Sequence, residues 1–134
     1  MTITGNAVAS SGLAIQQIRQ ISINVHDPDR AVAFYRDILG LKLLFRAGHL
    51  AFFDCDGIRL MLSPPEKPEF DHPSSILYFR VDDIQHAYVQ LQACNVKTEG
   101  VPNLVAKMPD HDLWLAAFRD SENNLLCLMA EVPR

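Results

Sequence analysis

The sequence predicts an α+β fold built from two copies of one βαβββ unit, and three observations support this prediction. Strand-like and helix-like patterns follow the same order twice, as strand, helix and then three strands. The stretch VHDPDRAVAFY matches VDDIQHAYVQL at a constant offset, and DGIRLML matches ENNLLCLM at a slightly larger one. The proline-rich segment SPPEKPEFDHPSS separates the two copies, because four prolines deny it both a helix and a central strand.

The first copy opens with an alternating pattern. Ile21, Ile23 and Val25 fall on one face of an extended chain, and polar residues fall on the other. A period of two with β-branched residues is typical of a half-buried strand. We therefore expect the apolar face to pack under a helix and the polar face to point the other way.

A helix follows this strand. Asp27 is a favourable N-cap, and Pro28 suits the first helical position, where its missing N–H is no loss. Gly40 supplies the expected end of the helix. The apolar residues between them recur at helical spacing: Ala31, Phe34, Tyr35 and Ile38.

Three short strands complete the first copy, over residues 41–46, 49–54 and 58–63. Gly48 and Gly57 lie between them, and glycine suits the positive φ that tight hairpins require. Residues 64–74 form the linker to the second copy.

The second copy repeats the pattern less clearly. We expect a strand over residues 76–81, a helix that ends near Asn95, and a weak strand over residues 96–99. A long polar loop is expected from residue 100 to about residue 111. The last two strands are then expected over residues 113–119 and 125–130.

Composition excludes several functions. At 134 residues the chain suits one domain, and its net charge of −4 gives no electrostatic reason to expect nucleic acid or an anionic membrane as partner. No apolar run approaches the roughly 20 residues that cross a bilayer. Cys55, Cys94 and Cys127 form neither a disulfide framework nor a zinc pattern, which suits a reducing cytoplasm. Residues 1–17 are expected to be a flexible tail.

Two stretches carry a resemblance to a known family. DPDRAVAFYRDILGL is similar to the opening helix of glyoxalase, bleomycin-resistance and extradiol-dioxygenase proteins, the vicinal-oxygen-chelate superfamily, and FRDSENNLLCLM resembles their closing hairpin. The resemblance implies a single domain over residues 18–131, with module one at 18–63 and module two at 75–131. It also implies that the modules form an eight-stranded cup with the helices outside, and that the protein is a homodimer.

The resemblance further implies where metal-using relatives place their ligands. Alignment gives Gln20 and Met61 in module one, and Ile76 and Cys127 in module two. Gln20 is a known substitute ligand. Met61 and Ile76 do not usefully bind a hard cation, and the single thiolate of Cys127 does not make a zinc site. We therefore expect no catalytic metal and no cofactor.

The cup implied by this fold has apolar walls and a few polar groups, as small-molecule pockets do. Arg59 and Arg80 come from matching strands of the two modules, where they would clamp an anion or else reach solvent. His111 and Trp114 form a polar and aromatic group that either serves ligand binding or lies in a solvated loop. The full set of expected ligand-binding residues is Gln20, Ser22, Asn24, Arg59, Met61, Tyr78, Arg80, His111, Trp114 and Cys127.

Two functions remain open from the sequence. The first is a small-molecule-binding protein of the bleomycin-resistance kind, without the usual metal. The alternative is a metal-dependent lyase, isomerase or dioxygenase of the glyoxalase superfamily. Such an enzyme needs a general base, normally a carboxylate at the cup floor, and the aligned positions contain none. No catalytic residue is assigned.

Overall fold

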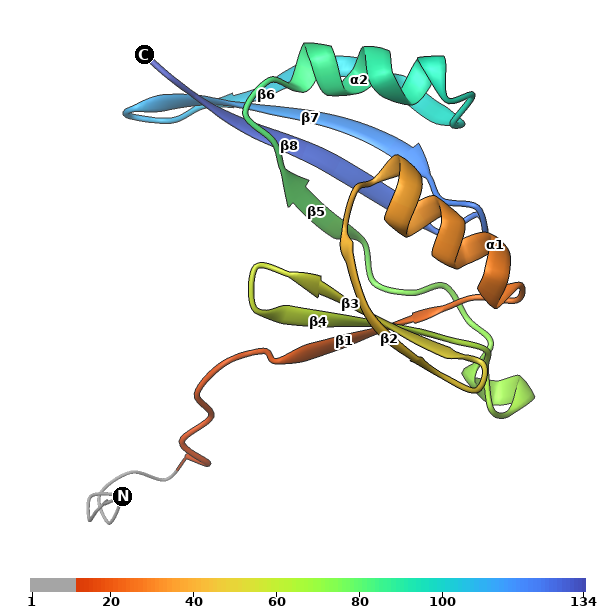
Figure 1. Cartoon of the computed structure of the whole chain (residues 1–134). Helices are drawn as coiled ribbons and strands as arrows, with labels where there is room; N and C mark the ends of the chain where they lie inside the picture. The colour runs from red at the N-terminus through yellow and green to blue at the C-terminus, as the bar shows by residue number, and fades with distance from the viewer. Residues whose placement is uncertain (1–11) are drawn as a thin grey trace.

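The computed structural model describes residues 12–134 and consists of two modules, each with one four-stranded sheet and one α-helix (Figure 1). The sheet orders are β1-β4-β3-β2 and β5-β8-β7-β6, so the second module repeats the topology of the first. The elements of module one are β1 (Gln20–Asn24), α1 (Pro28–Ala33), β2 (Lys42–Ala47), β3 (Leu50–Cys55) and β4 (Ile58–Ser63). Those of module two are β5 (Leu77–Arg80), α2 (Ile84–Ala93), β6 (Thr98–Lys107), β7 (His111–Arg119) and β8 (Leu125–Pro133). The predicted pair of βαβββ units is confirmed.

Each module begins with a strand that lies parallel to its last strand. β1 pairs with β4 and β5 pairs with β8 in parallel, whereas the remaining pairs in both sheets are antiparallel. A parallel pair needs a long crossover connection, and in each module the helix is part of that connection. The first and last strands of each module therefore lie side by side although they are distant in sequence.

The predicted start of the first helix is confirmed, and the second helix begins in the same way. The Asp27 carboxylate accepts a hydrogen bond from the Arg30 amide at 3.1 Å, and the Asp83 carboxylate accepts one from the His86 amide at 3.0 Å. After α1 the chain makes a π-helical turn at Phe34–Ile38, and Gly40 then adopts a φ of 74°. Glycine tolerates this left-handed conformation, so it ends the helix as expected.

One hydrophobic cluster spans both modules. Tyr35, Phe53 and Phe118 are its largest fully buried side chains. The predicted alternation is confirmed for the first and last strands that it covers, because the apolar residues in and beside β1, β5 and β8 belong to this cluster or pack against it: Ile21, Ile23, Val25, Leu77, Phe79, Val81, Leu126 and Leu128. The opposite side of each sheet, which points away from the cluster, is called its outer face below.

The two sheets remain separate, so one chain does not close the eight-stranded cup. Both sheets turn their helix-facing sides toward the shared core, so neither α-helix covers an outer face. Tyr78 on β5 is 53% exposed for this reason. No helix among residues 12–134 is long and apolar enough to cross a membrane.

The expected loop at residues 100–111 is wrong. β6 continues to Lys107, and β7 already begins at His111, so most of this segment is a β-hairpin. Pro102 lies within β6 because β6 is an edge strand, where a missing N–H is tolerated. The pairing register shifts between Glu99 and Asn103, which places the proline at an irregularity of the ladder.

Candidate functional site

The outer face of the first sheet brings together five of the predicted site residues. β1 contributes Gln20, Ser22 and Asn24, and β4 contributes Arg59 and Met61. The parallel register sets Gln20 opposite Arg59 and Ser22 opposite Met61. Side chains on one face of neighbouring strands are in contact distance, so the five form one surface.

Gln20 is held by its neighbours on this face. The Arg59 guanidinium donates from Nε to the Gln20 amide oxygen at 2.7 Å, and the Gln20 Nε2 lies 3.8 Å from the Met61 sulfur. The same guanidinium lies 5.6 Å from the centre of the Phe52 ring, which stacks on Phe45. The surface therefore combines a fixed positive charge with aromatic area.

The proline-rich linker forms a wall over this face. The Asn24 side chain donates to the carbonyl oxygens of Phe70 and His72, both at 2.8 Å, and the Asn24 amide donates to the Ser74 hydroxyl at 3.1 Å. A cavity of about 420 Å³ lies between the linker and the sheet, with Ser22 among its lining residues. Asn24 is thus a structural anchor for the linker as well as a site residue.

A second cavity of about 530 Å³ shares Asn24, His72, Pro73 and Ser74 with the first. Its other walls include Ile76 and Arg119 of module two. The two cavities flank the same stretch of linker, so the linker separates a pocket within module one from a pocket between the modules. The sequence identified the linker but not its contact with the sheet.

His26 and Asp71 close one side of the second cavity. The His26 Nε2 lies 3.0 Å from the Asp71 carboxylate, which joins the end of β1 to the linker. Both side chains are exposed, and an exposed ion pair contributes little to stability. We assign this pair to positioning of the linker.

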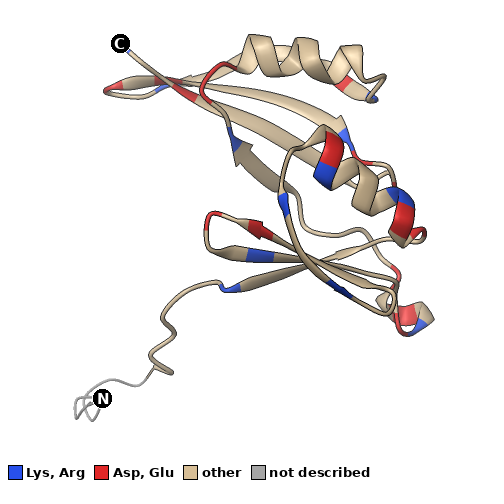
Figure 2. Ribbon diagram, viewed as in Figure 1, with Lys and Arg blue, Asp and Glu red and all other residues tan. Residues whose placement is uncertain are grey.

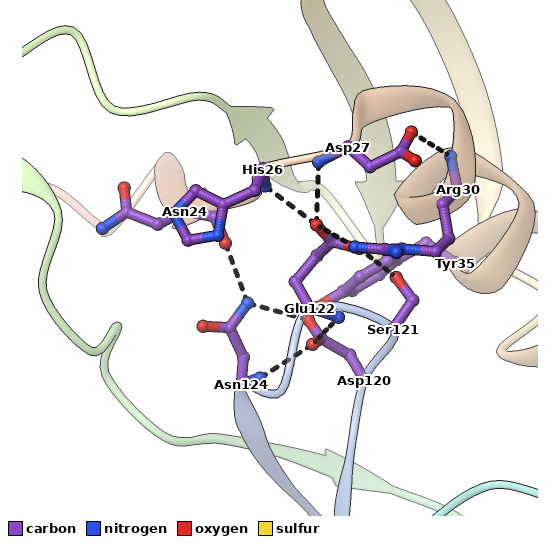
Figure 3. A network of polar contacts seen from close by, with 9 residues as sticks. All are labelled: Asn24, His26, Asp27, Arg30, Tyr35, Asp120, Ser121, Glu122 and Asn124. Atoms are coloured by element: carbon purple, nitrogen blue, oxygen red, sulfur yellow. Dashed lines mark hydrogen bonds and ion pairs between the residues drawn. The ribbon is translucent and has the colours of Figure 1, made fainter.

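A buried carboxylate joins the two modules beside the site (Figure 3). The Glu122 side chain is 1% exposed, and its Oε1 accepts hydrogen bonds from the amides of His26 and Asp27, both at 2.8 Å. Its Oε2 accepts from Arg30 Nε at 2.8 Å. Burial alone would raise the pKa of Glu122, but the bonds from Arg30, the two amides and Ser121 outweigh burial and lower the pKa to about 2.

Asp120 forms the second half of this network (Figure 3). Its Oδ2 accepts from the Tyr35 hydroxyl at 2.7 Å and from Asn124 Nδ2 at 2.9 Å, and its Oδ1 accepts from the amides of Glu122 and Asn124, both at 2.8 Å. Burial and the negative charge of Asp120 raise the pKa of the Tyr35 phenol far above its usual value. Asn124 also donates to the Asn24 carbonyl at 2.9 Å, which connects the network to the site.

The outer face of the second sheet holds three further predicted residues, Tyr78, Arg80 and Cys127. Tyr78 lies opposite Cys127 in the register. Cys127 is buried, its thiol donates to the Leu128 carbonyl at 3.3 Å, and burial raises the pKa of the thiol. A raised pKa disfavours the reactive thiolate, so Cys127 is a poor nucleophile.

The two predicted arginines lie on different sheets. Arg59 is on the outer face of the first sheet, where it contacts Gln20, and Arg80 is exposed on β5 of the second. Arg59 is on the last strand of module one and Arg80 on the first strand of module two, so the expectation of matching strands is wrong, and the anion clamp stays a prediction.

His111 and Trp114 do not form one group. His111 begins β7, with Nδ1 2.7 Å from the Asp110 carboxylate and Nε2 3.6 Å from that of Glu131. Trp114 lies opposite the buried Ala130 and packs against the core, on the side of the sheet that faces the helix. Successive residues of a strand point to opposite faces, so Trp114 is separated from Cys127 by the sheet itself.

The residues at the aligned metal positions do not suit a divalent cation. Gln20 carries the one hard donor atom among them, and that oxygen already accepts a hydrogen bond from the positively charged Arg59. Met61, Ile76 and Cys127 offer a thioether, a hydrocarbon and a buried thiol with a raised pKa. Residues 12–134 contain no group of three or more histidine, cysteine, aspartate or glutamate side chains that could hold a metal ion.

The protein therefore has an α+β fold made of two βαβββ modules. In each module the first and last strands are parallel, and candidate site residues lie on the outer face of the sheet. Residues 17–128 match the model of the Glyoxalase/Bleomycin resistance protein/Dioxygenase superfamily, and the chain belongs to that family.

Similar proteins include both enzymes and binding proteins. The metallothiol transferase FosB of Lysinibacillus sphaericus is 30% identical over 79 residues, which cover 59% of this chain and 48% of FosB, so the match spans about half of that relative. The solved lactoylglutathione lyase of Agrobacterium tumefaciens aligns with a TM-score of 0.67 at 21% identity, covering 87% of this chain and 95% of that one. TnmS3, an antibiotic binding protein from Streptomyces sp. CB03234, aligns with a TM-score of 0.68 at 23% identity, covering 90% and 99%. The structural matches support the fold alone.

Proposed function

We propose that this protein binds a small organic molecule at its outer sheet faces, as a homodimer and without a catalytic metal. The proposal rests on the side chains at the four positions that align with the metal ligands of the family: Gln20, Met61, Ile76 and Cys127. Arg59 occupies the oxygen of Gln20 and places a positive charge beside it, and a cation placed there would be repelled. The remaining three positions supply no oxygen or imidazole ligand.

The cavities support a ligand of metabolite or drug size. Their volumes of about 420 and 530 Å³ lie within the range of ordinary ligand pockets. Met61, Phe70 and prolines give the first cavity apolar walls, and Ser22 adds a hydroxyl group at its floor. The fold shared with an antibiotic binding protein is consistent with such a ligand.

Exposed apolar side chains on the outer faces support a dimer. Phe45 and Ile76 are each close to half exposed, and Tyr78 is more exposed still. Among residues 12–134, no strand pairs with the outer edge of β1 or of β5, since each is the first strand in its sheet order. A second copy of the chain would cover these apolar side chains and complete the cup that one chain leaves open.

The alternative, a metal-dependent lyase, isomerase or dioxygenase, rests on the resemblance to enzymes such as FosB. A residue that removes a substrate proton would also be required, and no carboxylate or imidazole stands at the four aligned positions. We therefore favour binding over catalysis. We also propose the cytoplasm as its location, because all three cysteines are free thiols.

Ligand binding can be tested by a thermal-shift screen of antibiotics and metabolites, followed by calorimetry on each compound that raises the melting temperature. Ser22→Trp would fill the floor of the first cavity, and we expect it to raise the Kd of such a compound by at least about tenfold. Val89→Trp is the matched control, because Val89 is exposed on α2 away from both cavities, and it should bind as the wild type does. Unchanged affinity in Ser22→Trp would contradict the assignment of the site.

A further inference from the structure

Residues 13–18 form an arm that is exposed throughout in the described part of the chain. Leu13 is 88% exposed, Ile15 is 81% exposed and Ile18 is 68% exposed. Within the described chain, no hydrogen bond, ion pair or ring contact is made by these six residues, and none of them belongs to the hydrophobic cluster. Figure 1 shows the arm running away from both sheets before it enters β1.

The arm has the composition of an interface segment. Its sequence, LAIQQI, contains no charged residue, so it has no electrostatic means of recognising a nucleic acid or another charged partner (Figure 2). Ala14 adopts a φ of 58°, a left-handed conformation that residues with a Cβ rarely adopt, and no hydrogen bond of Ala14 within residues 12–134 offsets this strain. Three large aliphatic side chains within six residues instead favour burial against another apolar surface.

We propose that the arm packs on a second copy of the chain and so forms part of the dimer interface. The arm leads directly into β1, whose outer face and free edge lie in the proposed interface, so the two surfaces are continuous. Six extended residues reach about 20 Å, which carries the arm beyond its own module. The second copy offers exposed apolar side chains within that interface, including Phe45, Ile76 and Tyr78. This inference rests on the dimer of the proposed function.

Removing the arm tests the inference without disturbing the core. A chain that begins at Gln17 should keep the circular dichroism spectrum and melting behaviour of a folded monomer, because residues 12–16, the described part of the deleted segment, do not belong to the hydrophobic cluster. Sedimentation equilibrium should show that its dimer dissociates at a concentration at least about 100-fold higher than the wild type, since Leu13 and Ile15 of both copies become unavailable for burial.

Two double variants distinguish the effect of the apolar side chains from the effect of shortening the chain. Leu13→Ser with Ile15→Ser should weaken the dimer nearly as much as the deletion, whereas the matched polar pair Gln16→Ser with Gln17→Ser should leave it unchanged. If the chain that begins at Gln17 forms a dimer as stable as that of the wild type, this inference is overturned and the proposed function stays intact. A monomeric wild-type protein would overturn both the inference and the proposed dimer.

Discussion

Replacing Asp120 with alanine is expected to lower the free energy of unfolding by about 3–5 kcal/mol. Asp120 is buried and accepts four hydrogen bonds, including one from the buried Tyr35 hydroxyl of module one. Alanine would leave all four donors without this acceptor, and a buried unsatisfied polar group destabilises the folded state. Urea denaturation followed by circular dichroism measures the change.

The matched control for this variant is Asp37→Ala. Asp37 is an aspartate too, but it pairs with the neighbouring Arg36, and both of these side chains are largely exposed. Because exposed ion pairs contribute little, we expect a loss below about 1 kcal/mol. A loss in Asp120→Ala no larger than that of the control would show that the network does not hold the modules together.

Acid should destabilise the protein through Glu122. Its pKa is about 2 in the folded protein against an ordinary value of 4.5, so its stabilising contribution is complete above pH 4.5 and is lost as the pH falls toward 2. The difference corresponds to about 3 kcal/mol, since one pKa unit is about 1.4 kcal/mol and the side chain is 1% exposed. Unfolding free energies measured from pH 7 to pH 2 should show this decline in the wild type.

Glu122→Gln isolates that contribution. Glutamine does not titrate, so the variant should be less stable than the wild type at pH 7, and its stability should fall less steeply between pH 4.5 and pH 2. Glu66→Gln controls for the loss of one negative charge, because Glu66 lies exposed on the linker. Equal pH dependence in Glu122→Gln and the wild type would refute the role of this carboxylate.

Local sequence patterns predicted most of the fold. Asp27 and Pro28 predicted the start of α1 because a capping side chain and a proline act within one turn of helix. Alternation assigned the core side of each sheet correctly, since the period of two is a property of the strand itself. The β6 strand was missed because Gly100 and Pro102 usually break strands, and the edge position that tolerates them depends on tertiary structure.

The candidate site was harder to predict, because it also depends on contacts between residues that are distant in sequence. Gln20, Ser22 and Asn24 could be assigned to one face by alternation, but the two carbonyls that Asn24 binds lie 46 and 48 residues away. Glu122 reaches Arg30 across 92 residues, so no local pattern distinguishes it from an ordinary turn residue. The separation of the sheets likewise follows from how the two modules pack, which strand patterns do not encode.

The absence of a catalytic metal is the central claim, and metal content tests it most directly. The purified full-length protein would be dialysed against manganese, nickel and zinc, then against metal-free buffer, and analysed by elemental mass spectrometry. Met61→Glu with Ile76→His is the comparison variant, because it adds a carboxylate and an imidazole at two of the four aligned positions. We predict that the wild type retains less than about one metal ion per ten chains, as its aligned positions suit no divalent cation. Retention of close to one ion per chain by the wild type would contradict the claim and favour a metal-dependent enzyme.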